Sequence, residues 1–110
     1  MAIYHIVMFK FKAQLPAEEI KAACDGMLGL GEKCVHPTTK AQYLKMLGGG
    51  KNNSPEGHQN EITHCFVVRF ENEEDRKYYT ESDPAHREFI AAVKDKVEKV
   101  QVVDFTPGEF

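Results

Sequence analysis

The chain has 110 residues, a formal net charge of −3 and 42% hydrophobic residues. These values are typical of one folded domain, expected here over residues 1–110, and they exclude a disordered chain. No basic patch is present that would hold a polyanion, and the apolar runs are far shorter than the roughly 20 residues of a membrane helix. The composition therefore predicts neither a nucleic-acid partner nor a membrane partner.

The cysteines and the first residues bear on the compartment. The N-terminal segment has neither the basic region nor the small-residue cleavage site of a signal peptide. The cysteines, Cys24, Cys34 and Cys65, follow no metal spacing. We therefore expect a cytoplasmic protein with reduced thiols and no metal. Cys24 and Cys65 are expected to be buried, and Cys34 to be the most accessible thiol.

The first half of the chain predicts a strand, a helix and a second strand. Residues 3–11 alternate with apolar side chains on both faces, which indicates a strand covered on both sides. Pro16, followed by two glutamates, marks a helix start, and the apolar positions of that helix are Ile20, Cys24, Met27 and Leu28. Residues 39–47 predict the second strand, and residues 48–60 predict a loop rich in Gly and Asn.

The second half predicts a strand, two short helices and a last strand. Residues 62–70 alternate, with Ile62, His64, Phe66, Val68 and Phe70 on one face. Asn72 is a predicted cap of a helix that runs to about Tyr79, and Asp83-Pro84 is a second helix start. The expected buried stripe of this last helix is Phe89, Ile90, Val93 and Val97, and residues 100–105 close as a strand.

The resulting order is β-α-β-β-α-β, with the second helical region broken in two. This order predicts an α+β fold of the ferredoxin-like split type, with an antiparallel four-stranded sheet and helices on one sheet face. The other face carries Tyr4, Ile6 and Met8 and is still apolar. We expect it to meet the same face of a second copy in a two-fold homodimer.

Five segments together resemble the stress-responsive A/B barrel (Dabb) family, a branch of the dimeric α/β-barrel superfamily. They lie in order over nearly the whole chain: residues 5–12, residues 63–68, Tyr78-Tyr79, residues 83–86 and residues 103–105. The resemblance implies a small dimeric α/β barrel. The loop over residues 48–56 and the tail look like those of fungal members, which implies a fungal source.

Within this family the chain is also similar to a plant polyketide cyclase, in which a tyrosine and three histidines form the site. Carried over by motif, these positions fall on Tyr79, His86, His5 and His64. The segment 80–83 is one residue longer here and places Asp83 where the cyclase has a histidine. Either Tyr78 or Tyr79 can therefore face the site.

The residues themselves indicate a pocket between sheet and helices. His5 and His64 lie among apolar neighbours on matching strand faces, which is typical either of satisfied core histidines or of a polar pocket. Because the two central strands run antiparallel, we expect these rings ~10–15 Å apart, lining one pocket without touching. The other expected lining residues are Val7, Phe9, Phe66 and Phe89.

His86 lies in the first turn of its predicted helix, where the positive dipole end favours a neutral ring that can act as a general base. Its other interpretations are a partner of the Asp83 cap or a surface histidine. The Tyr79 hydroxyl could orient a substrate oxygen, or the ring could pack against Phe89.

Two functions follow from these patterns. The first is a small homodimer whose mainly apolar pocket holds a small aromatic or polyketide-like ligand. The second is a polyketide cyclase or isomerase that needs no cofactor, with His86 as the base and Tyr79 as the oxygen-orienting group. Both interpretations predict no metal and no cofactor.

Overall fold

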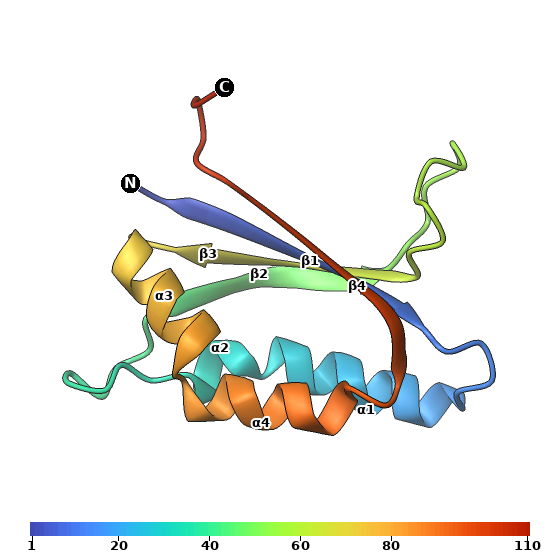
Figure 1. The fold of residues 1–110 in the computed structure, drawn as a ribbon, viewed down its shortest axis with the longest axis horizontal. Coiled ribbons are helices and arrows are strands. Elements are labelled where there is room, and N and C mark those ends of the chain that lie inside the picture. The colour runs from blue at the N-terminus through green and yellow to red at the C-terminus, as the bar shows by residue number, and fades with distance from the viewer.

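The computed structural model describes residues 1–110 as one antiparallel sheet with helices on one face (Figure 1). The strand order is β2-β3-β1-β4, so the predicted α+β ferredoxin-like fold is confirmed. In chain order the elements are β1 (Ile3–Phe11), α1 (Ala17–Leu28), α2 (Leu30–Lys33), β2 (Leu44–Lys51), β3 (His64–Phe70), α3 (Glu73–Glu81), α4 (Pro84–Val93) and β4 (Val97–Phe105).

The central strand β1 sets the register of the sheet. Its side chains alternate between buried and half-buried along the whole strand, as the sequence predicts. His5 lies opposite Val68 of β3 on one side and opposite Asp104 of β4 on the other. Three strands thus bring residues from both ends of the chain to one point on the helix-covered face.

Both predicted helix caps are present. The Asn72 side chain accepts a hydrogen bond from the backbone N–H of Asp75, and the Asp83 side chain accepts one from Ala85. Each bond satisfies a backbone N–H that the helix start leaves unpaired. Figure 1 shows the result: α3 and α4 meet at a corner, and α4 then runs beneath the sheet beside α1.

The predicted position of the second strand is wrong. It spans Leu44–Lys51 instead of 39–47, and so includes glycines that the sequence assigns to a loop. Within this strand, position 49 requires glycine, because a Cβ there would lie 2.1 Å from Cδ2 of Phe66 on the neighbouring strand. Gly48 has φ +144° at an irregularity in the pairing with β3, a conformation that glycine adopts without strain.

The predicted apolar stripes of the helices are partly wrong. In α1 the buried residues are Ala23 and Met27, whereas Leu28 is exposed. In α4 only Val93 is buried, Phe89 is half-buried and Ile90 is exposed. The helix ends earlier than predicted, so that Val97 opens β4. Because Phe89 and Ile90 are not fully packed against the sheet, a cavity remains beside α4.

The predicted accessibility of the cysteines is also wrong. Cys34 is fully buried, and Cys24 and Cys65 are half-buried. Cys34 lies beside a polar contact inside the core, in which the Tyr43 hydroxyl donates to Asp83 at 2.5 Å. The helix end at Cys34 is therefore not a surface site.

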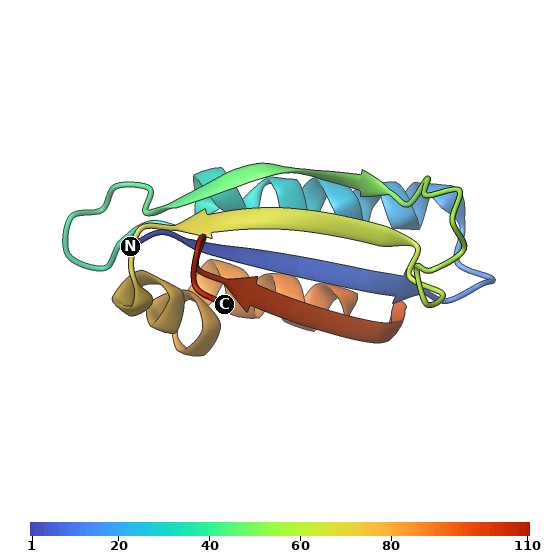
Figure 2. The ribbon, with the colours of Figure 1, turned by 90° about the horizontal axis from the view of Figure 1, so that it is seen from above.

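The sheet face that carries no helix is apolar. Tyr4, Ile6 and Met8 are half-buried on it, and Val103 and Phe105 of β4 are exposed beside them. The loop between β2 and β3 and the C-terminal tail both rise on this side, opposite the helices (Figures 1 and 2). None of the helices has the length and apolar character needed to cross a membrane.

Candidate functional site

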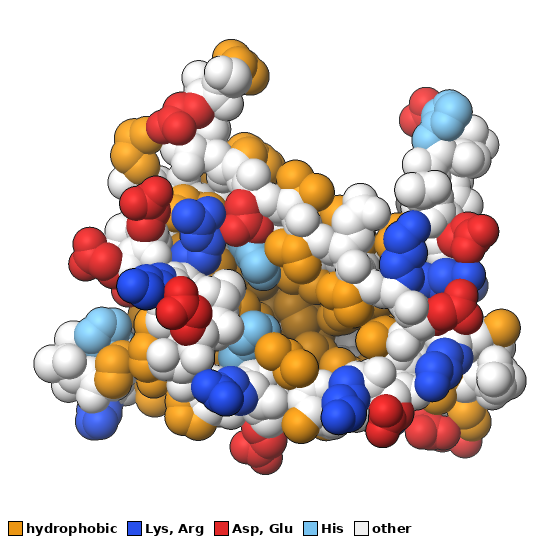
Figure 3. Space-filling view, in the orientation of Figure 1, with side chains coloured by type: hydrophobic (Ala, Val, Ile, Leu, Met, Phe, Trp, Pro, Cys, Tyr) orange, Lys and Arg blue, Asp and Glu red, His pale blue; other side chains and the backbone are white.

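A cavity of about 620 Å³ lies between α4 and the strands β1 and β4. Its walls are mostly apolar and include Val7, Phe9, Phe89 and Val93, as the sequence predicts for the first three. Ile90 and Val102 are about half exposed and lie among its lining residues. Figure 3 shows this side of the molecule hollowed at the centre, with hydrophobic side chains inside and histidines beside the hollow. The volume suits a small organic ligand.

His86 is the polar residue that α4 contributes to the cavity. Its Nδ1 lies 2.8 Å from the backbone oxygen of Tyr79, and since a carbonyl oxygen only accepts, Nδ1 carries the proton. Burial lowers the pKa of His86 below its ordinary value, and His5 acts in the same direction. The ring is therefore neutral near pH 7, and Nε2 keeps a lone pair that no protein group occupies.

His5 extends into the cavity from β1, and a hydrogen bond from its Nδ1 fixes its orientation. Its Nδ1 donates to the Asp104 carboxylate at 2.7 Å, and the second oxygen of Asp104 accepts from Arg76 of α3 at 3.2 Å. The register of β4 against β1 places Asp104 directly beside His5. The carboxylate orients the imidazole and fixes a proton on its Nδ1.

Tyr79 lies between the two imidazoles. Its ring stacks on His86 with centroids 3.8 Å apart and meets His5 edge-on at 5.9 Å. The hydroxyl is fully buried and has no hydrogen-bond partner. Burial raises its pKa, and Cys34 and Asp83, both buried, raise it further. Tyr79 is thus the inward-facing tyrosine, but its hydroxyl has no surface that a ligand in the cavity could touch.

Tyr78, the other candidate of this pair, faces away from the cavity. It is half-buried and packs against Tyr43 and His36. The expectation that Tyr79 packs against Phe89 in the core is replaced by its stacking on His86.

His64 and Phe66 do not line the cavity, which corrects their expected role. His64 packs edge-on against Phe11 at 4.9 Å, and its Nδ1 is bonded to the Thr63 hydroxyl at 2.9 Å. It lies opposite Phe9, four positions along β1 from His5. Burial lowers the pKa of His64, which is the behaviour of a neutral core histidine.

Two polar residues of the site were not identified from the sequence. Asp104 carries the carboxylate that holds His5, and Arg76 holds Asp104. The sequence does contain a signal for Asp104. In the alternating pattern of the last strand, Asp104 falls on the same face as Val100 and Val102, and a carboxylate in line with two valines is unusual enough to mark a site. Nothing in the spacing of α3 points to Arg76.

The arrangement supplies the parts of acid–base chemistry. His86 offers a neutral nitrogen that can accept a proton, and His5 is a second imidazole, oriented by Asp104. Both act at one end of an apolar cavity, where hydrogen bonds and charges are less screened than in water. Nowhere in the chain do three His, Cys, Asp or Glu side chains gather in a way that could hold a metal ion.

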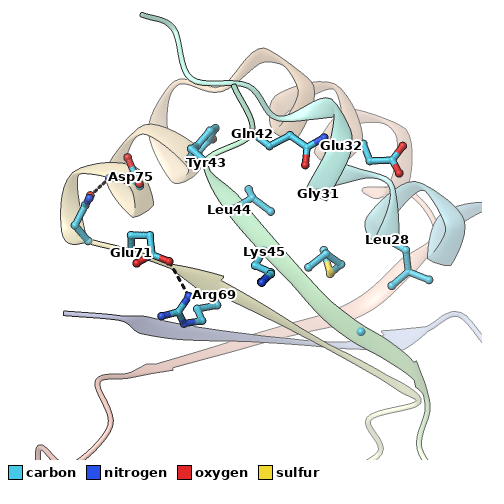
Figure 4. Close-up of a pocket in the computed structure, with 13 residues that line it drawn as sticks. Leu28, Gly31, Glu32, Gln42, Tyr43, Leu44, Lys45, Arg69, Glu71 and Asp75 are labelled. Carbon is cyan, nitrogen blue, oxygen red and sulfur yellow. Dashed lines mark hydrogen bonds and ion pairs between the residues drawn. The ribbon is translucent and has the colours of Figure 1, made fainter. Parts of the chain in front are cut away.

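A second groove, of about 850 Å³, runs along β2 on the other side of the molecule (Figure 4). Its walls are mainly polar, and some of the polar groups in it are already paired. Arg69 bonds Glu71 at 2.7 Å, and the side chain of Asn72 is used to cap α3 at Asp75. The groove holds no unpaired imidazole or thiol, so the smaller cavity beside His86 is the candidate site.

Comparisons with known proteins agree with this description. The sequence profile of the family described as "Stress responsive A/B Barrel Domain" matches residues 3–107. A curated relative from Arabidopsis thaliana, "Stress-response A/B barrel domain-containing protein HS1", is 29% identical over 105 residues, which are 96% of this chain and 89% of the relative.

Solved structures with the same fold include an enzyme and a dimer. A hydroxynitrile lyase from Passiflora edulis superposes with a TM-score of 0.83 at 21% identity, covering 99% of this chain and 96% of that one. A dimeric ferredoxin-like protein of unknown function from Bacteroides fragilis superposes with a TM-score of 0.65 at 23% identity, covering 94% of each chain. At these identities the two structures support the fold.

Proposed function

The chain belongs to the stress-responsive A/B barrel domain family, and we propose that it is a homodimer whose protomers each bind a small aromatic or polyketide-like molecule in the cavity beside His86. The observation that carries the ligand proposal is the cavity itself. It is large enough for a bicyclic ring system, mostly apolar, and ends at an imidazole nitrogen with no protein partner.

The dimer is proposed through the open sheet face. Tyr4, Ile6, Met8, Val103 and Phe105 form one apolar surface on it, which is the kind of patch that soluble proteins cover with a partner. The loop between β2 and β3 and the C-terminal tail rise around this surface (Figure 1). The similar protein from Bacteroides fragilis is itself described as dimeric.

Ligand binding is tested with prodan, an uncharged naphthalene dye whose emission shifts in apolar surroundings. We expect saturable binding to the wild-type protein. Val102→Trp should weaken it at least tenfold, because Val102 is half exposed and lines the cavity, so a larger ring can block it without entering the core. Ala91→Trp is the control, on an exposed position of α4 outside the cavity lining. Equal binding by both variants, or no saturable binding, contradicts the proposal.

A second candidate function, catalysis without a cofactor, is favoured by the contrast between the two imidazoles. His86 is neutral and unpaired at Nε2, whereas the Nδ1 of His5 is hydrogen-bonded to the Asp104 carboxylate. In this reaction class His86 takes a proton from a carbon next to a carbonyl. The electron pair of the C–H bond moves to the carbonyl oxygen, which becomes an enolate oxygen at the polar end of the cavity. Cyclisation or isomerisation of a polyketide-like substrate starts with this step.

The proton transfer can be measured without knowing the natural substrate. The α-hydrogens of 2-tetralone exchange with D₂O when a base removes them, and NMR follows the exchange. We expect the wild-type protein to accelerate it and His86→Gln to lose about 10²–10⁴-fold of the acceleration. His58→Gln, in the loop between β2 and β3, is the control and should retain the full rate. An exchange rate equal to that in buffer excludes this second function for bicyclic benzylic ketones such as 2-tetralone.

A further inference from the structure

The cavity offers hydrogen-bond acceptors at its histidine end. The proton of His86 is fixed on Nδ1 by the Tyr79 carbonyl, so Nε2 presents only a lone pair. Thr80, which also lines the cavity, uses its hydroxyl proton on the carbonyl of Lys77 at 3.3 Å.

His5 complements this arrangement. Its Nδ1 proton is held by Asp104, so Nε2 accepts a hydrogen bond when the ring is neutral and donates one when the ring is protonated. Burial lowers the pKa of His86, so that ring stays neutral and Nε2 stays an acceptor. A ligand group that reaches Nε2 of His86 must therefore donate a hydrogen bond to it.

We infer that the ligand of this cavity carries a hydroxyl group, phenolic or alcoholic, that donates a hydrogen bond to Nε2 of His86. A hydroxyl donates a hydrogen bond, so it pairs with the free lone pair on Nε2 of His86. A carboxylate would set negative charge against the lone pair of His86, and a bare hydrocarbon would leave that nitrogen unpaired. The remaining walls are mostly apolar, with Val7, Phe9, Phe89 and Val93, and suit an apolar body, although Lys94, Glu98 and Lys99 also line the cavity. The inference rests on the proposed function, because it assumes that the cavity binds a small molecule.

Three naphthalenes of nearly equal shape test the hydroxyl. The wild-type protein is titrated with 2-naphthol, 2-methylnaphthalene and 2-naphthoate, and His86 is followed in long-range ¹H–¹⁵N spectra. We expect 2-naphthol to bind about 3–10-fold more tightly than 2-methylnaphthalene, the value of one hydrogen bond in a partly buried site. We expect 2-naphthoate to bind most weakly. The Nε2 signal of His86 should move with 2-naphthol and stay unchanged with 2-methylnaphthalene.

Two variants connect the preference to one residue. His86→Phe keeps an aromatic ring against Tyr79 but removes the acceptor, so it should bind 2-naphthol and 2-methylnaphthalene equally well. His58→Phe, in the loop, should keep the wild-type preference. The comparison of ligands on the wild-type protein decides the matter even where His86→Phe folds poorly.

The outcomes separate this inference from the proposed function. Equal affinity of the wild-type protein for 2-naphthol and 2-methylnaphthalene overturns the inference that the ligand carries a hydroxyl group, but leaves the proposal of ligand binding intact. Tightest binding of 2-naphthoate overturns it as well, since the site would then select an anion. Absence of saturable binding by all three naphthalenes, together with no binding of prodan, removes the proposed function and the inference with it.

Discussion

The imidazole of His86 lies flat on the ring of Tyr79, 3.8 Å between centroids and 18° from parallel, and donates its Nδ1 proton to the backbone oxygen of the same residue. Tyr79 precedes the corner between α3 and α4, and His86 follows it. The Asp83 cap thus fixes the geometry, because it sets where α4 starts relative to the last turn of α3. One tyrosine determines both the orientation and the tautomer of the proposed base.

The first prediction concerns pH. Because burial lowers the pKa of His86 in the folded protein, the unfolded chain takes up a proton first as the pH falls below about 6.5. The contribution of neutral His86 to the free energy of unfolding is therefore fully present above that pH and is lost as the pH falls toward 5. His86→Gln should lessen this decrease, measured as the difference in urea unfolding free energy between pH 7.5 and pH 5.5. His64 contributes in the same direction and remains in the variant, so part of the decrease should persist. An unchanged pH dependence would contradict the assigned environment of His86.

The second prediction compares two buried tyrosines. The Tyr79 hydroxyl has no partner, so Tyr79→Phe removes an unsatisfied group and should leave stability unchanged or raise it by up to about 1 kcal/mol. The Tyr43 hydroxyl donates to buried Asp83, so Tyr43→Phe should cost about 1–3 kcal/mol. Urea unfolding of both variants at pH 7.5 measures the contrast. A larger loss for Tyr79→Phe would mean that its hydroxyl is paired in solution.

The third prediction concerns the open sheet face. Met8 lies on this face opposite Cys65 and Gln101, near the middle of the proposed interface. Met8→Lys should give a monomer or a precipitate, because a lysine there would be buried without a partner in the dimer. Val67→Lys should behave in the same way.

Sedimentation velocity measures the oligomeric state of both variants. Ala91→Lys, on an exposed position of α4, is the control and should sediment as the wild-type protein does. A soluble native monomer of the wild-type protein would contradict the dimer.

The sequence predicts most of the fold because its strongest signals are local. The alternation of β1 and β3 and the caps Asn72 and Asp83 depend on neighbours within a few residues, and the structure confirms them. The predicted bounds of β2 are wrong because one of its glycines, Gly49, is required by contact with Phe66 of another strand. A spacing rule within one segment does not contain that information.

The candidate site was predicted in part for the same reason. Strand alternation assigns His5 and His64 to the same face but does not say which end of the sheet the cavity occupies, so His64 was included wrongly. The pairing of His5 with Asp104 depends on the register between the two ends of the chain. Strand periodicity gives the face of each residue, and tertiary register decides which residues meet.

The fourth prediction concerns the thiols. Cys34 is fully buried, and burial raises the pKa of its thiol to about 12, with Asp83 acting in the same direction. The thiolate that reacts with a disulfide reagent is therefore scarce. Folded protein at pH 8 should leave Cys34 unmodified after Cys24 has reacted, and mild urea should release it. Peptide mapping after labelling identifies the sites. Early modification of Cys34 would mean that the core opens near Asp83 more readily than its burial indicates.

The fifth prediction compares two neighbouring glycines of β2. A Cβ at Gly49 would lie 2.1 Å from Cδ2 of Phe66 and 2.7 Å from the backbone oxygen of Cys65, and the backbone atom cannot swing aside as a flexible side chain can. Gly49→Ala should therefore destabilise the protein by about 1–3 kcal/mol through overpacking. Gly50→Ala meets nothing within 4 Å and should change stability by less than about 0.5 kcal/mol. Thermal and urea unfolding of the pair measure the difference, and since both variants add the same methyl group to the same strand, strand propensity cancels between them. Equal stabilities would show that β2 shifts away from Phe66 at little cost. Steric contact would then not explain why glycine occupies position 49.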